Sequence, residues 1–274
     1  MTVRVRSLLF VLLLPMLAPV AEVSAQRRGR GNIQAMLGDP NEFYTPPEFR
    51  GNAKYDGRFT FARIKYRGFM CFQREGPGWS HDYPRAESHF MRIMRAVTAM
   101  RPFVEHDGIE GGNIIALDDP NLFKYPVAYL SEPGGWRPTG AEAAALGKYL
   151  AKGGFLIVDD FEENCSGDGD MANFAAVMGQ VLPKGKIMEV PASHPIFDSF
   201  YKIDLGLLGG GRRSQATWLG VFQDNDPKKR LMVIANYMND IGEAWQWSDQ
   251  GFNIAPTNEA YKLGVNYIIY ALTH

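Results

Sequence analysis

The middle of the chain constrains the fold most, because it predicts a helix followed directly by a buried strand. Thr139 and Glu142 have the spacing of a capping box, which marks the first turn of a helix. Gly153-Gly154 can end that helix in a left-handed turn. Residues 155–158 (Phe-Leu-Ile-Val) then form a near-continuous apolar run, typical of a strand buried on both faces. This segment favours a parallel sheet that is covered by helices on both faces.

Strand-like and helix-like segments alternate along the rest of the chain. Residues 59–66 alternate apolar and polar side chains, which predicts a strand. Further strands are predicted at 103–105, 113–117, 126–130, 187–190, 216–222 and 231–237. Helices are predicted over 84–97, from a cap at Asp170 to Val181, and from Thr257 to Tyr270. Alternating strands and helices imply βαβ crossovers, and therefore an α/β fold with a mostly parallel sheet.

The first 25 residues have the three regions of a secretory signal. Arg4 and Arg6 precede an apolar run over residues 8–14, and Val23-Ser24-Ala25 places small residues at a cleavage site before Gln26. The apolar stretch is shorter than the ~20 residues of a spanning helix. We therefore expect an exported protein, periplasmic or extracellular, with a retained membrane anchor as the alternative.

Residues 26–56 lack periodicity and are rich in proline and glycine, so we interpret them as an irregular arm or linker before a domain over residues 57–274. No later segment is apolar enough to span a bilayer. The net charge of −1 gives no basic excess, which argues against a nucleic-acid partner. Cys71 and Cys165 follow strands predicted at one edge of the sheet, where they form either a disulfide or two thiols.

Polar side chains follow three of the predicted strands, where an open parallel sheet binds its ligands. The first strand and the strand at residues 155–158 are expected to place their loops side by side. Together these loops form the predicted rim site: Trp79, Asp82, Tyr83, Asp159, Asp160, Asn236 and Asp240. Aromatic rings beside carboxylates suit a polar ligand such as a sugar. The alternative is that Trp79 and Tyr83 pack into the core.

Other patterns give no catalytic or metal assignment. Asp159-Asp160 could bind Ca²⁺ or Mg²⁺ with the nearby Glu162, Glu163, Asp168 and Asp170, but the spacing matches no EF-hand loop. A solvated acidic loop is the favoured interpretation, and neither a metal nor another cofactor is predicted. His194 precedes Pro195 and is interpreted as a structural hydrogen-bonding residue. Nucleophile-elbow, zinc-protease and phosphate-loop motifs are absent from the sequence.

The order of these landmarks resembles the DUF4159 family, a bacterial domain of uncharacterised function. The segments that carry the resemblance are residues 59–66, Trp79 with 82–84, 125–126, 129–130, 149–150 with 153–160, 194–197, 236–237 with 240–242, and 264–266. The resemblance implies a flavodoxin-like three-layer α/β/α sandwich of the class I glutamine amidotransferase-like superfamily, ThuA-like in shape. Active relatives carry a nucleophile elbow after the strand at 155–158, where this chain has Asp159-Asp160. Cys165 comes several residues too late for that role.

Two functions remain open from the sequence. The missing elbow favours a non-catalytic exported module that binds an unidentified ligand, such as a carbohydrate, or an envelope protein. The alternative is a hydrolase-like enzyme acting on carbohydrate or cell-envelope material through Asp159, Asp160 or His194. An enzyme needs two such groups close to one point of a concave site.

Overall fold

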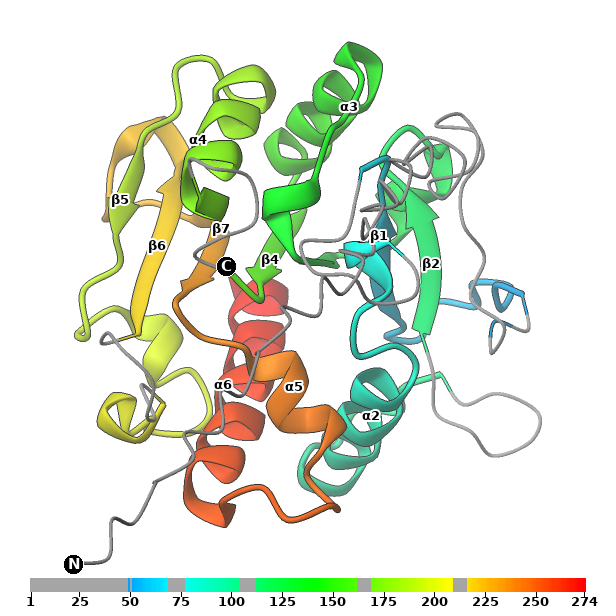
Figure 1. The fold of residues 1–274 in the computed structure, drawn as a ribbon, viewed down its shortest axis with the longest axis vertical. Helices are drawn as coiled ribbons and strands as arrows, with labels where there is room; N and C mark the ends of the chain where they lie inside the picture. Colours follow the sequence, from blue (N-terminus) through cyan, green and yellow to red (C-terminus); the bar gives the residue numbers. More distant parts are fainter. Residues whose placement is uncertain (1–48, 50, 69–76, 104–111, 162–168, 209–215) are drawn as a thin grey trace, which may run out of the picture. The chain divides into compact units, whose positions relative to one another are not determined.

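The computed structural model describes residues 49, 51–68, 77–103, 112–161, 169–208 and 216–274. The chain divides into two units, Met1–Gly38 and Asp39–His274, and every described residue belongs to the second. These residues form an α/β fold with a seven-stranded, mostly parallel sheet and five α-helices (Figure 1).

The sheet has the strand order β2-β1-β3-β4-β7-β6-β5. The strands are β1 (Phe61–Lys65), β2 (Gly112–Ala116), β3 (Val127–Ser131), β4 (Phe155–Asp159), β5 (Ile187–Glu189), β6 (Thr217–Phe222) and β7 (Leu231–Tyr237). The first five in this order are parallel, whereas β6 runs antiparallel to both of its neighbours, β7 and β5. The predicted inner strands at residues 59–66 and 155–158 are confirmed, because β1 lies between β2 and β3, and β4 lies between β3 and β7.

Helices cover both faces of this sheet. They are α2 (Arg85–Val97), α3 (Gly140–Ala151), α4 (Gly169–Val181), α5 (Ile241–Gln246) and α6 (Ile254–Thr273). Alternate side chains of β4 enter two separate cores. Phe155 and Ile157 pack in one core with residues of α2, α5 and α6, and Leu156 and Val158 pack in the other with residues of α3 and α4. The buried apolar run thus has the environment that its sequence predicts.

Local signals set the helix ends. The capping box of α3 is confirmed, since the Thr139 amide donates to Glu142 Oε2 (2.7 Å) and the Glu142 amide donates to Thr139 Oγ1 (3.2 Å). Two predicted starts are wrong by a few residues. Helix α6 begins at Ile254 with Asn253 as its cap, not at Thr257, and α4 begins at Gly169, so Asp170 lies in its first turn. The short helix α5 was not predicted.

Residues 51–56 line the outer edge of β2, and we call them the edge strap. Asn52 Nδ2 donates to the Ile114 carbonyl (2.7 Å), and the Ile114 amide donates to Asn52 Oδ1 (2.8 Å). The Asn113 amide group makes the same reciprocal pair with the backbone of Ala53. Since an unpaired sheet edge can recruit other chains, the strap gives β2 a partner within its own chain.

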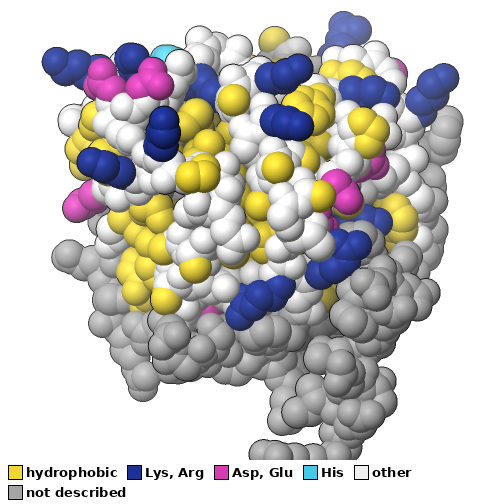
Figure 2. All heavy atoms as spheres, turned by 90° about the horizontal axis from the view of Figure 1, so that it is seen from above, with side chains coloured by type: hydrophobic (Ala, Val, Ile, Leu, Met, Phe, Trp, Pro, Cys, Tyr) yellow, Lys and Arg dark blue, Asp and Glu magenta, His cyan; other side chains and the backbone are white. Residues whose placement is uncertain are grey.

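Several predictions lie outside the described residues. These are the signal segment 1–25, most of the arm at 26–56, the strand at 103–105 beyond Phe103, the pair Cys71 and Cys165, and the acidic residues Glu162, Glu163 and Asp168. Within the described ranges, no helix has the length and apolar character needed to cross a bilayer. On the surface seen in Figure 2, lysine and arginine side chains are interspersed with acidic and apolar ones.

Candidate functional site

The loops after β1, β4 and β7 bring four titratable side chains together at the carboxyl edge of the sheet. His81, Asp82, Asp160 and Asp240 each offer one nitrogen or oxygen atom, and these atoms lie within 4.8 Å of one another. We call this group the His–Asp cluster. Three of its members, Asp82, Asp160 and Asp240, belong to the predicted rim site. His81 was not included in that prediction.

Arg63 of β1 holds the loop that carries His81 and Asp82. Its buried guanidinium forms an ion pair with Glu87 of α2 and donates to the carbonyls of Trp79 (2.9 Å) and His81 (2.8 Å). Burial disfavours the charged form of Arg63, but Glu87, together with Tyr129 and Asp82, more than offsets this and raises its pKa. A strand residue therefore fixes the position of the first loop.

His81 and Asp160 form the shortest contact of the cluster. His81 Nδ1 lies 2.6 Å from Asp160 Oδ2 and 3.3 Å from Glu132 Oε1, and the histidine side chain is 16% exposed. The loops after β1 and β4 thus meet, as expected, but the two strands are not neighbours, because β3 lies between them. The loop after β1 reaches Asp160 across the end of β3, against which its Gly78–Ser80 turn packs.

Asp82 is the most unusual member of the cluster. Its side chain is buried, and neither carboxylate oxygen has a hydrogen-bond partner among the described residues. Burial raises the pKa of Asp82 to about 8, and the charge of Asp160 adds to this effect, while His81 and Arg63 act against it. A carboxylate in this position is stabilised by a proton, by hydrogen-bond donors or by a positively charged partner.

Asp240 completes the cluster from the loop after β7. Its Oδ1 accepts from the Glu243 amide (2.7 Å) as the N-cap of α5, and the residue is partly buried. Burial and the nearby charges of Asp160 and Asp82 raise the pKa of Asp240 well above its ordinary range. Three acidic groups thus lie within 4.8 Å of one another, and each disfavours the ionised form of the others.

Asp159 has a structural role beside the cluster. Its carboxylate accepts four hydrogen bonds, from Tyr129 Oη (2.8 Å), Asn236 Nδ2 (2.8 Å) and the amides of Ile241 (3.3 Å) and Gly242 (2.8 Å). Burial raises the pKa of Asp159, and these donors act against that shift. Asp159 and Asn236, both predicted as site residues, therefore anchor the start of α5 and so hold Asp240 in place.

The predicted aromatic residues of the rim site belong to the core. Trp79 is 1% exposed and lies in the apolar cluster on the α3 and α4 face, and Tyr83 packs against the same cluster. Trp79 and Tyr83 therefore pack with the core, which was the alternative interpretation of these two residues. The ring of Trp79 offers no exposed face on which a sugar could stack.

Comparison with family models gives a match over most of the described domain. Residues 60–272 match the model of the family described as Domain of unknown function (DUF4159), which spans more than half of the chain. The chain belongs to the DUF4159 family. None of the curated proteins matches it. The resemblance inferred from the order of the motifs is thereby confirmed.

Four residues around the cluster of this DUF4159 domain have left-handed backbone conformations that are uncommon for residues other than glycine. They are Asp82 (φ 64°), Glu132 (φ 48°), Asp160 (φ 60°) and Met238 (φ 60°). They come from the loops after β1, β3, β4 and β7. Such conformations cost energy and concentrate at functional sites, so their convergence on this edge supports a functional assignment.

Sequence reasoning missed Arg63, Glu87, His81 and Glu132. A charged residue inside the predicted inner strand was a usable signal for Arg63, because a buried arginine requires an ion pair. The pairing of His81 with Asp160 had no comparable signal, since 79 positions separate the two residues. The interpretation of His194 as structural agrees with the structure, where its Nδ1 accepts from the Ile196 amide as a helix cap.

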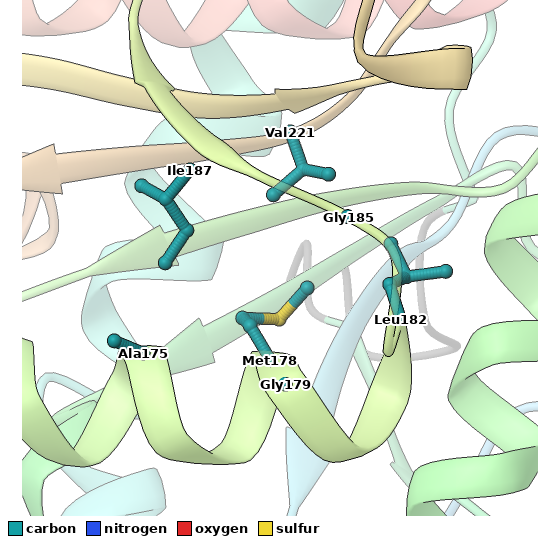
Figure 3. Close-up of a pocket in the computed structure, with 7 residues that line it drawn as sticks. All are labelled: Ala175, Met178, Gly179, Leu182, Gly185, Ile187 and Val221. Carbon is teal, nitrogen blue, oxygen red and sulfur yellow. The ribbon is translucent and has the colours of Figure 1, made fainter.

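Two apolar cavities lie on other parts of the DUF4159 domain. One of about 130 Å³ lies between α4 and the strands β5 and β6, where Met178 points toward Ile187 and Val221 (Figure 3). Its lining residues are Ala175, Met178, Gly179, Leu182, Gly185, Ile187 and Val221. A second, of about 390 Å³, is lined mainly by α2 and α6. Neither includes a member of the His–Asp cluster.

Proposed function

We propose that this DUF4159 domain is an exported, non-catalytic ligand-binding module with a flavodoxin-like three-layer architecture of the class I glutamine amidotransferase-like type. The strand order supports this architecture, since β2-β1-β3-β4 followed by a fifth parallel strand is the flavodoxin-like arrangement. Helices on both faces of the sheet agree with it.

The end of β4 argues against amidotransferase chemistry. Active relatives carry their nucleophile at this point, whereas Asp159 stands here with a carboxylate that already accepts four hydrogen bonds. A carboxylate held in this way cannot attack a substrate. Binding without covalent catalysis is the function that this geometry supports best.

One observation carries the proposal, namely the two buried oxygens of Asp82 that lack a hydrogen-bond partner among the described residues. Together with Asp160 and Asp240 they present hydrogen-bond acceptors to one point. The ligand should therefore supply positive charge or hydrogen-bond donors, as amines and sugars do.

A hydrolase is the second candidate, and the pairing of His81 with Asp160 favours it. A histidine oriented by a carboxylate and next to a second carboxylate is a common general-base arrangement. Asp159 and His194, considered for this role from the sequence, are occupied by backbone contacts. The substrate class would be carbohydrate or cell-envelope material.

A ligand screen by thermal shift tests the binding proposal on the chain that starts at Gln26. The probes are amino sugars, polyamines and soluble cell-wall fragments, applied to the wild type, to Asp82→Asn and to the control Asp249→Asn, whose side chain is 57% exposed. We expect a ligand that stabilises the wild type and the control but not Asp82→Asn. If no probe gives a saturable shift, or if Asp82→Asn responds like the wild type, the proposal is wrong.

Product release from the same wall fragments tests the second candidate. A hydrolase would release reducing sugars or new amino groups, and His81→Gln would abolish that release. Export is tested separately by expressing the full chain in a bacterium and sequencing the protein recovered outside the cytoplasm. The expected first residue is Gln26, and a protein retaining residues 1–25 would contradict cleavage.

A further inference from the structure

We infer that the His–Asp cluster is the binding site of one divalent transition-metal cation, held by His81, Asp82, Asp160 and Asp240. The inference rests on the binding site proposed above and names the chemistry of its ligand. Neither the sequence patterns nor the family description assigns a metal to this chain.

The spacing of the donor atoms suits a single ion. Metal–ligand bonds of roughly 2.1 Å place two donors on one ion between about 3 and 4.2 Å apart. His81 Nε2 lies 3.8 Å from Asp82 Oδ1, and the widest separation in the cluster is within 4.8 Å. A closure of about 0.6 Å would bring even a pair at this upper limit into the range that two donors of one ion span.

The charges of the site favour a cation. Asp82, Asp160 and Asp240 each place a carboxylate oxygen within 4.8 Å of the other two, so their negative charges repel one another. The buried guanidinium of Arg63, which holds the loop that carries Asp82, is already paired with Glu87. Buried carboxylates without a compensating charge are costly, and a dication would neutralise two of them.

Asp82 provides an observation that is independent of the clustering. It is buried, it contributes a donor atom to the cluster, and neither of its oxygens has a hydrogen-bond partner in the described part of the chain. Arg63 fixes the loop on which it lies through the carbonyl of His81. The acceptor is therefore positioned before a ligand arrives, as a preorganised ligand residue should be.

Asp160 and His81 bring two of the donors together. Asp160 Oδ2 lies 2.6 Å from His81 Nδ1, so a carboxylate oxygen and an imidazole nitrogen face each other in the cluster. The other ring nitrogen, Nε2, then lies on the side of Asp82. His81 is 16% exposed, which leaves a route for an ion from solvent.

The donor set selects the class of metal. Imidazole suits Zn²⁺ and Fe²⁺, carboxylates suit Mn²⁺, and a mixed set of one nitrogen with carboxylate oxygens serves these ions better than Ca²⁺ or Mg²⁺, which prefer oxygen alone. We therefore expect Mn²⁺ and Zn²⁺ to bind more tightly than Ca²⁺ and Mg²⁺.

Titration calorimetry on the chelator-treated full chain tests the site, with Mn²⁺, Zn²⁺, Ca²⁺ and Mg²⁺ as separate probes and elemental analysis for stoichiometry. We expect one equivalent of Mn²⁺ or Zn²⁺ per chain. Asp82→Asn and Asp240→Asn should each weaken binding at least tenfold, while Asp249→Asn should bind like the wild type. Tighter binding of Ca²⁺ or Mg²⁺, or no stoichiometric binding, would overturn the inference.

The stability of the metal-free variant shows whether Asp82 is a metal ligand or a residue needed for folding. Asp82→Asn replaces a buried carboxyl group that has no hydrogen-bond partner among the described residues. The metal-free variant should therefore be at least as stable as the metal-free wild type while losing its stabilisation by metal. If Asp82→Asn does not fold, His81→Gln replaces it, and wild-type affinity in that variant would overturn the assignment.

The two proposals fail in different ways. If an amine or sugar stabilises the chelated wild type through Asp82 and no metal binds, the binding module stands and the metal site falls. If a metal binds stoichiometrically and no organic probe does, the cation is itself the ligand, and the metal inference stands.

Discussion

Arg63 connects three parts of the molecule through a single side chain. It lies in β1, pairs with Glu87 of α2 and donates to two carbonyls of the loop that carries His81. Its guanidinium also lies 4.9 Å from the ring centre of Tyr129. Arg63 is therefore a positioning residue for the His–Asp cluster, with no contact to the predicted ligand itself.

Replacing Arg63 by methionine should destabilise the fold strongly. The change leaves Glu87 buried without its cation and removes the hydrogen bonds from Arg63 to two carbonyls. Breaking a buried pair typically costs about 3–5 kcal/mol. Urea unfolding measures the loss. The double variant Arg63→Met with Glu87→Leu should recover part of it, since no buried charge remains. A loss below about 1 kcal/mol in the single variant would contradict this role.

His194 should make stability depend on pH. Burial lowers its pKa, with a smaller contribution from His274. As the pH falls below about 6.5, the unfolded chain binds a proton before the folded chain does. The contribution of His194 is therefore present at neutral pH and is lost as the pH falls through about 6.5 toward the lowered pKa.

His194→Asn tests this dependence, because asparagine can still cap the short helix at residues 195–197. Denaturant unfolding at neutral pH and at about pH 5 gives the comparison. We expect the wild type to lose more stability than the variant between the two conditions. Equal losses in both proteins would rule out a titrating role for His194.

At the scale of single elements, α5 depends on one carboxylate that precedes it by 82 positions. Asp159→Asn replaces an oxygen that accepts two hydrogen bonds by an amide that donates, in either orientation of the side chain. We expect a loss of at least about 2 kcal/mol in the free energy of unfolding. Hydrogen exchange should be faster at the amides of Ile241 and Gly242.

The exposed Asp249→Asn serves as the control for this prediction and should change stability by less than about 0.5 kcal/mol. Unchanged exchange at Ile241 and Gly242 in the Asp159 variant would show that α5 does not depend on this carboxylate.

Helix α3 depends instead on a local signal. Thr139→Ala removes the side-chain acceptor of the capping box and should cost about 1 kcal/mol in thermal or urea unfolding. Thr139→Ser keeps the hydroxyl and should lose much less. Equal effects of the two substitutions would assign the loss to the methyl group and not to the cap.

This contrast explains which elements could be predicted from the sequence. The strands and α3 were predicted because their signals lie within a few residues, as in the apolar run 155–158 and the pair Thr139 and Glu142. Helix α5 has only six residues, and its N-cap, Asp240, was assigned to the rim site. The His–Asp cluster joins positions 81, 160 and 240, and no local pattern encodes that pairing.

At the scale of the whole molecule, the edge strap belongs to the folded unit although the domain was predicted to begin at residue 57. A chain that starts at Gly57 lacks the hydrogen bonds of Asn52 and Ala53 to β2. It should melt at a lower temperature and aggregate more than a chain that starts at Gly51. Asn52→Ala should give a smaller decrease. Equal melting temperatures would contradict a structural role for the strap.

The position of β7 beside β4 has a consequence for the time course of synthesis. The four strands β2, β1, β3 and β4 are complete by residue 159, but β7, the second neighbour of β4, is made only at residues 231–237. Until then a central, apolar strand has one open edge, and pairing between segments so far apart forms slowly. A growing chain therefore passes through a stage in which half of the sheet is formed and its open edge could pair with other nascent chains. Protection by a chaperone would matter most while the roughly 70 residues between β4 and β7 are being synthesised.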